Sequence, residues 1–419
     1  MVQVADLAPG STREYELIDD AVLRIDSFAE PDRRLVEIAL CNDAEAVGRI
    51  PVHQWLFQAK LYVEAGDQAV FLPVRDALND THRDPDEEVN RLNLQYRDRL
   101  EFAVGRTCSV DWHEVTGTRR ASKVWTTWLP VSETPQTRAT AAEGVITDMR
   151  VLATASVEEL RAGLEPIAAG YATWLEQQKA NAATLPAHLQ PDADEAIIEA
   201  SQAATRLNQG IAYLVDHEDA LKCFRFMNGV MADQRVHTEI AALRSKDDSL
   251  EADQAAAQVA ARGASAHSWR MFQLAFVLMQ IPALCDPAHK RRADPSLAQV
   301  ELLFFPTGGG KTEAYLGLAA FTFAIRRLQG VVDSADGPLD GRSGLAVLMR
   351  YTLRLLTAQQ FQRASTMVCA AELARRDKPE LWGAEPFRIG LWVGTNVSPK
   401  RVKEADEQLR AAADSGYDH

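Results

Sequence analysis

Short runs in which apolar and polar residues alternate dominate the first third of the chain. Alternation with a period of two over four to eight residues is typical of half-buried β-strands. Turn-forming clusters, among them 64–67 and 79–88, separate the runs. The pattern predicts a β-rich module of sandwich or barrel type over residues 1–140, with strands at 35–40, 68–74, 100–104 and 123–129.

Two tryptophans in the last run, Trp125 and Trp128, lie close in sequence to Arg119, Arg120 and Lys123. Aromatic rings beside basic groups are typical of platforms on which nucleic-acid bases stack. Tryptophans on a strand more commonly pack in a core, and we favour that interpretation here.

A helical periodicity replaces the alternating one after the polar stretch 133–142, which we interpret as a linker. Ser156 and Glu159 have the spacing of a capping box, in which each side chain accepts a hydrogen bond from the backbone of the other residue. They precede an apolar stripe that begins at Leu160. This pattern therefore predicts a helical domain over residues 141–262.

Two longer helices are expected within this domain, at 195–215 and 217–243, with a break near 216. The second carries Arg225 and Arg235, whose guanidinium groups suit phosphate contacts, but we favour solvated or salt-bridged roles for both. Residues 246–265 are rich in Ala, Asp and Gln, so we expect a mobile or exposed segment there. The apolar stripe of the second helix predicts core packing and consists of Phe224, Phe226, Met227, Val230 and Met231.

From residue 263 onward, apolar runs alternate with helical stretches. A compact apolar helix is expected at 269–284, ended by Pro282 because proline lacks the N–H that a helix interior needs. Buried strands that alternate with helices predict an α/β fold with an open parallel sheet, here of the RecA-like kind. The expected strands are 302–305, 344–349 and 388–393, and a long helix is expected at 356–376.

A glycine-rich loop follows the first of these strands and leads into a helix. Successive glycines let backbone N–H groups surround a phosphate, and the helix N-terminus directs a partial positive charge at the same anion. In such a loop Lys311 is expected to reach the β- and γ-phosphates of ATP, and the Thr312 hydroxyl to bind Mg²⁺. The loop consists of Pro306, Thr307, Gly308, Gly309, Gly310, Lys311 and Thr312.

One flank of the loop departs from the consensus G-x-x-x-x-G-K-[ST], because Phe305 stands where glycine is usual. The Gly-Lys-Thr end is intact. Strand, glycine loop and helix arrive in the required order, so we prefer a phosphate-binding loop to a chance Gly-rich turn. Residues 263–419 are then expected to form the first part of a RecA-like lobe of a P-loop NTPase.

Composition limits the classes of protein to which the chain can belong. It has 419 residues, of which 47% are hydrophobic and 25% charged, so there are enough apolar side chains for a large core. The formal net charge is −14, from 45 basic and 59 acidic residues. Such a charge argues against a general nucleic-acid coat but leaves room for a local basic groove.

Five cysteines are scattered along the chain without a C-x-x-C pair. This spacing indicates reduced thiols in a cytoplasmic protein, and it indicates neither a zinc site nor a disulfide framework. The first residues lack the pattern of a signal peptide, and no apolar run reaches the length that spans a membrane. We therefore expect a cytoplasmic location and no membrane partner.

The second half carries motifs that resemble those of superfamily 2 helicases. The glycine loop resembles their motif I, and Phe272-Gln273, in a predicted helix upstream, resembles their Q motif. The segment 350–360 resembles motif Ia, and Gly394-Thr395 resembles the glycine-bearing loop of motif Ib.

Four longer blocks resemble more narrowly the helicase-like subunits of DISARM bacteriophage-defence systems. The blocks read FRFMNGVMADQR, WRMFQLAFVLMQIPAL, LFFPTGGGKTEAYLGLAAF and VLMRYTLRLLTAQQFQRA. The resemblance covers the latter half well and the β-rich part more loosely, through KVWTTWLPV. It implies two partners: a companion DISARM subunit, DrmB, and DNA that is single-stranded or has a single-stranded end.

The resemblance also implies roles for individual residues. Gln273 is expected to read the adenine edge of ATP, with Phe272 or Trp269 packed near the base; a surface glutamine on an amphipathic helix is the alternative. Motif Ia is expected to hold one DNA strand through its phosphates, independently of sequence. The alternative for the two arginines among these motif Ia residues is that both are solvated charges. The residues expected to contact DNA are Arg350, Thr352, Arg354, Thr357 and Gln360.

One departure from the helicase pattern follows the third expected strand. Such enzymes need an Asp-Glu motif II to position Mg²⁺ and water, and a second lobe whose arginines close over the nucleotide. No Asp-Glu-x-x-His or Asp-Glu-x-x-Asp box follows a strand after Lys311, and the sequence ends at His419. We therefore expect the N-terminal part of a larger protein, with the hydrolytic half downstream.

Three functions remain open. The first is an ATP-driven DNA helicase or translocase in anti-phage defence, which motif Ia favours. The second is a phosphate-loop ATPase switch that remodels a protein partner without translocating on nucleic acid. The third is a scaffold that binds without hydrolysing ATP, which the intact Lys311-Thr312 pair disfavours.

Overall fold

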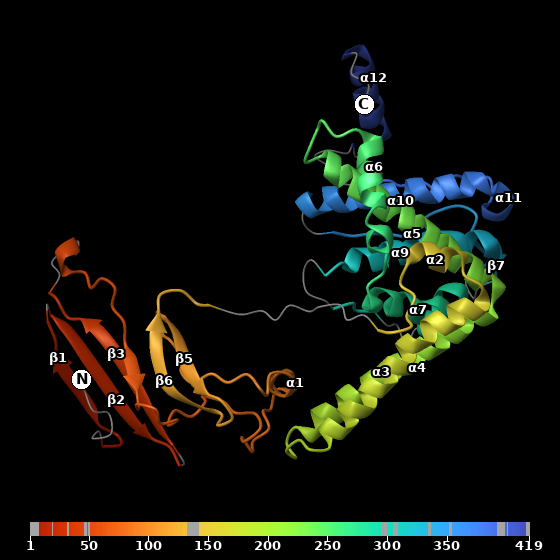
Figure 1. Ribbon diagram of the computed structural model, residues 1–419. Coiled ribbons are helices and arrows are strands. Elements are labelled where there is room, and N and C mark those ends of the chain that lie inside the picture. Colours follow the sequence, from red (N-terminus) through yellow and green to blue (C-terminus); the bar gives the residue numbers. More distant parts are fainter. Residues whose placement is uncertain are drawn as a thin grey trace. The chain divides into compact units, whose positions relative to one another are not determined.

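The computed structural model describes residues 8–18, 20–31, 33–45, 48, 51–131, 142–294, 296, 300–304, 309–333, 337–351, 354–391, 399 and 401–415. The chain forms two compact units (Figure 1). The first comprises Met1–Pro135 and Ala182–Glu195, and the second comprises Gln136–Asn181 and Ala196–His419.

The first unit contains antiparallel strands, as the alternating pattern predicts. One three-stranded sheet has the order β1-β2-β3 and the other has the order β4-β6-β5, so the described strands form two open sheets and no barrel. The elements are β1 (Thr12–Glu16), β2 (Ala21–Ala29), β3 (Arg34–Asn42), a 3-10 turn (Val52–Gln54), β4 (Tyr62–Glu64), α1 (Glu87–Gln95), β5 (Ser109–Val115) and β6 (Arg120–Thr127).

Two of the strands predicted for this unit do not form. Residues 68–74 and 100–104 take part only in isolated bridges to neighbouring segments. Their apolar side chains still reach the core, since Phe71 and Phe102 belong to the same apolar cluster as Ala121 of β6. The alternation therefore indicated which side chains are buried but not which backbones pair. None of the four strands named from it corresponds to β1, β2, β4 or β5, and α1 was not expected.

Trp128 contradicts the expected core role of the two tryptophans. It lies just beyond the end of β6, where it has no strand to cover it, and it is 67% exposed. Trp125 is half-buried and pairs in register with Tyr62 of β4. Its neighbour Val124 is buried, so Trp125 faces the side of the sheet that is turned away from the core.

The second unit is mostly helical, as the periodicity predicts. The capping box is confirmed, because the Ser156 N–H donates to Glu159 at 2.8 Å and the Glu159 N–H donates to Ser156 at 3.2 Å. The break near residue 216 is confirmed by His217, the N-cap of α5. The first elements are α2 (Met149–Thr154), α3 (Val157–Ala182), α4 (Gln190–Asp216), α5 (Glu218–Arg244), α6 (Ala252–Ala260), a 3-10 turn (Gly263–Ala266) and α7 (Met271–Cys285).

The remaining elements surround the predicted phosphate loop and the helix that follows it. They include the long helix expected at 356–376, which is observed as α10. They are α8 (Lys290–Ala293), α9 (Lys311–Gln329), β7 (Val331–Val332), β8 (Leu339–Asp340), α10 (Arg354–Asp377), α11 (Pro379–Trp382) and α12 (Val402–Ser415).

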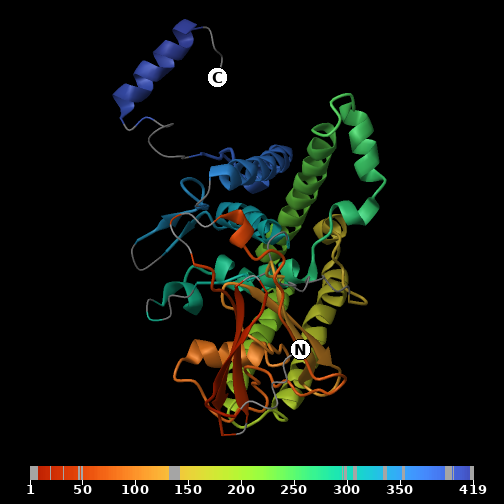
Figure 2. The same cartoon turned by 90° about the vertical axis from the view of Figure 1, so that its left-hand side faces the viewer.

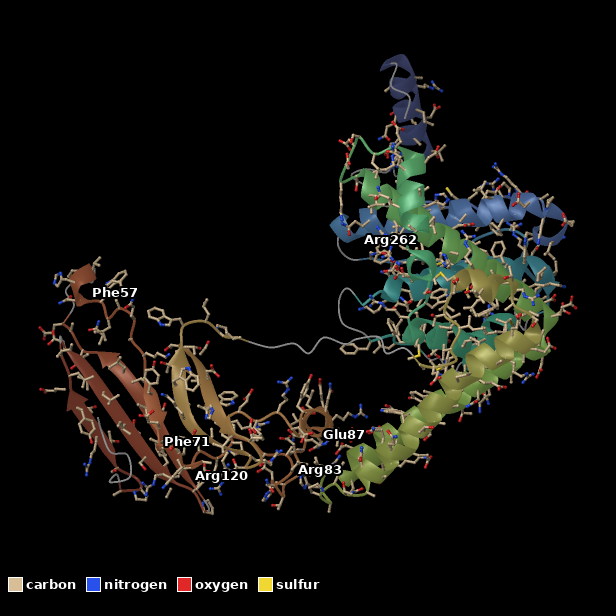
Figure 3. The ribbon with its side chains drawn as sticks, in the orientation of Figure 1. Phe57, Phe71, Arg83, Glu87, Arg120 and Arg262 are labelled. Atoms are coloured by element: carbon tan, nitrogen blue, oxygen red, sulfur yellow. The ribbon has the colours of Figure 1, made fainter. Side chains whose placement is uncertain are left out.

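The turn between α3 and α4 belongs to the first unit. Arg83 donates hydrogen bonds of 2.5 and 2.9 Å to the buried Asp192 carboxylate (Figure 3). His188 lies 2.8 Å from the Ala77 carbonyl. Because bidentate arginine–carboxylate pairs are among the stronger polar contacts, they tie the loop before α1 to this turn.

Helix α5 forms the centre of the second unit, where it packs against α2, α6, α9 and α10. Its apolar stripe supplies fully buried side chains, among them Phe224, Met227 and Met231. Phe321 of α9 and Met367 of α10 are buried in the same cluster. The expected core role of the stripe is confirmed, and this packing fixes the position of α9.

Most of residues 246–265 are exposed, which confirms one of the two alternatives expected for this segment. They contain α6, which runs alongside α5 (Figures 1 and 2). Ala255 and Val259, one helical turn apart, are fully buried, and the Glu251 N–H donates to Gln254 at 3.4 Å. Two small side chains at helical spacing are enough to seat a helix, because they let two backbones approach closely.

Pro282 does not end the apolar helix, which continues to Cys285 as α7. A proline inside a helix leaves the carbonyl four residues earlier without its usual N–H partner. That carbonyl belongs to Leu278, and a Cβ atom at Gly210 of α4 would lie 2.0 Å from its oxygen. Helix α4 therefore passes close to α7 at the point where the proline disturbs it.

The expected parallel sheet is the main correction. The described residues of the three expected strands, 302–304, 344–349 and 388–391, do not form strands. Leu302 and Phe304 are 81% and 85% exposed, whereas a parallel strand is covered on both faces. Apolar runs predicted burial, but a strand also needs neighbours for its backbone N–H and C=O groups, and the described strands form antiparallel pairs only.

The described part of the chain was searched for membrane-spanning helices and for metal-binding clusters. No helix there combines the length and apolar character needed to cross a bilayer. Nor do the described residues gather three or more His, Cys, Asp or Glu side chains that could hold a metal ion. All five cysteines are free thiols, and burial, followed by the charge of Asp219, raises the pKa of the Cys285 thiol to about 12.

The close approach at Gly210 leads to a first prediction. Gly210→Ala should lower the free energy of unfolding by about 1–3 kcal/mol, because the new methyl group overlaps the Leu278 carbonyl and the helices must shift. Gly170→Ala in α3 is the matched control, since no atom lies within 4 Å of its Cβ position and helix propensity favours alanine. Chemical denaturation of both variants measures the difference; equal stability of the two variants would contradict the packing described.

Candidate phosphate-binding site

The end of the glycine loop forms the N-terminus of α9. Gly310 is the N-cap, with a φ of +84° that favours glycine. A Cβ atom there would also lie 2.8 Å from Gln273 Nε2. Lys311 and Thr312 are half-buried in the first two positions of the helix, where backbone N–H groups have no intrahelical acceptor and create a partial positive charge.

Two side chains at the start of α7 hold the loop. Arg270 donates to the Gly309 carbonyl at 2.6 Å, and the Gln273 amide donates to the Gly310 carbonyl at 2.5 Å. The Gln273 oxygen accepts a hydrogen bond of 2.8 Å from the Arg270 backbone N–H. Gln273 is 3% exposed, so the alternative of a surface glutamine is wrong. Its reading of adenine stays a prediction.

A buried carboxylate, Glu313, lies in the first turn of α9. Its Oε1 accepts hydrogen bonds from Arg363 of α10 and from Arg235 of α5, the latter at 3.4 Å. Its Oε2 is buried and has no hydrogen-bond partner among the described residues. The salt-bridged interpretation of Arg235 is thus confirmed, whereas Arg225 donates to the Ala155 carbonyl.

Sequence reasoning missed Glu313 and Arg363, although α9 carried a signal. Glu313 lies three and seven residues before Leu316 and Ala320, so all three share one face of the helix. That face is buried, and a carboxylate on it requires a cationic partner. The periodicity was thus the signal by which an ion pair at Glu313 could have been found, but it does not indicate which arginines supply it.

Basic side chains outnumber carboxylates around the loop. Arg235 also pairs with Glu239 at 3.9 Å, and Glu239 is shared with Arg262 at 3.2 Å (Figure 3). This local excess of positive charge contrasts with the chain's net charge of −14, and it favours an anionic ligand. The basic side chains that contact the loop or Glu313 are Arg235, Arg270 and Arg363, and Lys311 is the first residue of α9.

Trp269 takes part in the core beneath the loop. It is 3% exposed, and its indole N–H donates to the buried Asn228 side chain at 2.7 Å. A Cβ atom at Gly317 of α9 would lie 2.7 Å from the Trp269 ring, so glycine at this position lets α9 sit close to the indole. The Trp269 ring is therefore occupied by packing, which leaves Phe272 as the expected neighbour of a base.

The structure places part of the predicted DNA-binding set near one cavity. Arg350 is exposed and Gln360 is half-buried, and both line the cavity. Arg354 and Thr357 are residues of α10. The predicted residues that lie outside the described part are Phe305, Pro306, Thr307, Gly308, Thr352, Gly394 and Thr395.

This cavity, of about 1200 Å³, lies between α9, α10 and the extended segments 341–351 and 385–391. Arg326 of α9 donates to two backbone carbonyls of the first segment, at 2.7 and 3.3 Å. The Arg327 guanidinium lies 5.0 Å from the centre of the Phe387 ring in the second. The segments expected as the second and third strands therefore line α9 without pairing as strands.

Two arginines anchor the chain just upstream of the loop. Arg206 of α4 and Arg291 of α8 each donate to the Glu301 carboxylate at 2.9 Å. Burial raises the pKa of Glu301, but these hydrogen bonds outweigh that effect, so its pKa lies below the ordinary value. Glu301 consequently stays ionised at neutral pH.

Comparison with known proteins adds an independent finding. No model of a known protein family matches the chain. Among curated proteins, DISARM protein DrmA from Bacillus paralicheniformis is 32% identical over 328 residues. The match includes 74% of this chain and 27% of the Bacillus protein, so the chain spans about a quarter of the length of that relative.

The bond from Gln273 to Gly310 generates a second prediction. Gln273→Ala should increase hydrogen exchange at the amides of residues 310–313, because the loop loses one of the two side chains that hold its carbonyls. Gln280→Ala is the matched control on the same helix, since Gln280 accepts from Arg206 instead. Exchange that rises equally in both variants would show that the Gln273 contact does not hold the loop.

Proposed function

We propose that the chain, a DrmA-like protein, binds ATP with Mg²⁺ at the N-terminus of α9. We further infer that it works as part of an ATP-driven DNA helicase or translocase in DISARM defence. The similarity to the Bacillus DISARM protein DrmA supports the defence role. The chemistry rests on the site's own residues.

One observation carries the nucleotide proposal. A glycine loop that is held through two carbonyls leads directly into a helix whose first residue is Lys311. Bonds to the carbonyls of Gly309 and Gly310 limit the directions in which the loop can turn its N–H groups. Helix dipole, Lys311 and the surrounding arginines all favour the same kind of ligand, a polyphosphate.

The residues fit a magnesium nucleotide. Thr312 is the second residue of α9, beside Lys311, and its hydroxyl would bind the ion while Lys311 would contact the β- and γ-phosphates. When bound, Mg²⁺ would neutralise charge on the phosphates. The excess of basic groups in the cluster would compensate the remaining charge.

The DNA part of the proposal rests on residues around α10. Arg350 and Gln360 line a cavity that also contains Arg326, Arg327 and Arg388. Phosphate contacts from arginine are independent of base sequence, as a translocating protein requires. Motif Ia would thus hold a strand at the edge of the cavity, next to the helix that carries the phosphate loop.

The second candidate is an ATPase switch that remodels a protein partner without moving on nucleic acid. The net charge of −14 favours it, because an acidic chain repels a nucleic-acid backbone outside local basic sites. Stimulation of ATPase activity in the complete protein separates the two: single-stranded DNA stimulates a translocase, and only the protein partner stimulates a switch.

DISARM membership also implies companion subunits, and we propose DrmB as the partner of one of the two regions without a catalytic constellation. These regions are the β-rich module and the helices from α3 to α5. Co-purification of DrmB with a variant that lacks residues 1–140 distinguishes them. Retention of DrmB would assign the contact to the helices or to another part of the protein.

A third prediction tests the phosphate loop. Lys311→Ala should weaken Mg·ATP binding about 10- to 100-fold, because it removes a charge-assisted contact of about 1.5–3 kcal/mol. Lys222→Ala is the control, since Lys222 is a surface lysine of α5 that pairs with Glu218 at 2.8 Å. Titration with a fluorescent ATP analogue measures both affinities, and an unchanged affinity in the Lys311 variant would exclude the assigned role.

A fourth prediction tests the DNA contact. Replacing Arg350 and Thr357 by Ala should weaken single-stranded DNA binding to a similar extent for all sequences. It should also reduce the slope of log affinity against log salt by about one, for the lost arginine. Arg376→Ala serves as the control, because Arg376 lies 22 residues along α10 from Arg354, about 30 Å away. A salt slope equal to that of the unmodified chain would show that these two residues do not contact the DNA strand.

A further inference from the structure

We propose that Glu313 is a positioning residue that couples the nucleotide site to α10 through Arg363, so that nucleotide binding changes the affinity for DNA. This inference rests on the proposed function, because it requires a nucleotide at the N-terminus of α9. It goes beyond that function in naming the side chains through which the two sites communicate.

The contacts of Glu313 join three helices at one carboxylate. It is the third residue of α9, two positions after Lys311, and its Oε1 accepts from both Arg363 of α10 and Arg235 of α5. Its side chain is 9% exposed, whereas those of Arg363 and Arg235 are 26% and 28% exposed. The carboxylate is therefore the buried centre of the cluster, and the guanidinium groups lie nearer to solvent.

The second oxygen points to a ligand. Glu313 Oε2 is buried and has no hydrogen-bond partner among the described residues. It lies 3.3 Å from the position that a Cβ on Gly310 would occupy, so it borders the loop itself. A buried carboxylate oxygen without a donor is unfavourable. The phosphates of a nucleotide bring only acceptors, but the water ligands that Mg²⁺ usually keeps would bring donors and relieve this cost.

A phosphate at the loop would change the balance of charge that Glu313 now sets. Glu313 borders the loop at Gly310, and it holds Arg363 and Arg235 together. A polyphosphate bound beside it is a second and stronger anion for the same arginines. Any shift of Arg363 toward the phosphate is transmitted to α10, because Arg363 is part of that helix.

Coupling of this kind is reciprocal. If nucleotide binding changes how α10 presents its phosphate-binding residues, DNA binding must change nucleotide affinity by the same factor. Glu313 and Arg363 lie within the second unit, so one folded body contains the whole path. The pair is thus a link between the motif I loop and the motif Ia helix.

The experiment measures DNA affinity with and without nucleotide. The 419-residue chain is titrated into a fluorescein-labelled oligothymidine, in the absence and presence of saturating Mg·ATPγS, and the ratio of the two affinities is the coupling. We expect the unmodified chain to show a coupling of at least about fivefold. Glu313→Gln and Arg363→Gln should each reduce the ratio toward one, and the double variant should do no more than either alone.

Two further variants keep the test independent of misfolding. Arg363→Lys retains the charge and should recover part of the coupling. Arg376→Gln changes another arginine of α10 whose partner is Glu372, and it should leave the ratio unchanged. Melting temperatures of all variants establish that each is folded before the ratios are compared.

The outcomes separate the two claims. An unmodified chain that does not bind Mg·ATPγS overturns the proposed function and the coupling with it. A chain that binds nucleotide but keeps its full coupling after Glu313→Gln and Arg363→Gln overturns the coupling alone. Loss of coupling in these two variants, with nucleotide affinity retained and the Arg376 variant unaffected, supports it.

Discussion

Burial of one face of α9 against α5 and α7 is the constraint on which the second unit depends. Leu316, Ala320 and Phe321 are fully buried on that face, and Gly317 leaves room for the Trp269 ring. The apolar contact fixes where the helix begins, and so it fixes the position of the glycine loop. Only at that end does the face become polar, where Glu313 is buried between two arginines. Packing thus determines the geometry of the site, and charge determines the ligand that it suits.

The sequence predicted those features that depend on local pattern. Helices α3, α4, α5 and α10 follow from apolar periodicity, and the capping box at Ser156 follows from the spacing of two side chains. The family resemblance assigned Gln273 to the adenine edge of ATP, which stays a prediction, and the structure shows a contact from Gln273 to the Gly310 carbonyl that the resemblance did not imply. In each case the information lies within a few turns of the chain, or in a motif with a known mechanism.

Features that depend on contacts between residues far apart in the sequence were not predicted. Apolar runs at 302–305 and 344–349 have the composition of buried strands, yet a strand forms only if another backbone lies beside it. Trp125 and Trp128 show the same difference, because composition does not reveal that β6 ends before Trp128. Arg363 was missed for a related reason: its partner, Glu313, lies 50 residues away along the chain.

The central claim is that the N-terminus of α9 binds the phosphates of a nucleotide. The most direct measurement is hydrogen exchange of the whole chain with and without saturating Mg·ATP, read by mass spectrometry. The account predicts slower exchange in peptides that cover the first turns of α9 and the start of α7, because bound phosphate accepts hydrogen bonds from the loop and rigidifies it. It predicts no change in β1 to β6. Unchanged exchange at α9, or protection confined to the first unit, would contradict the account.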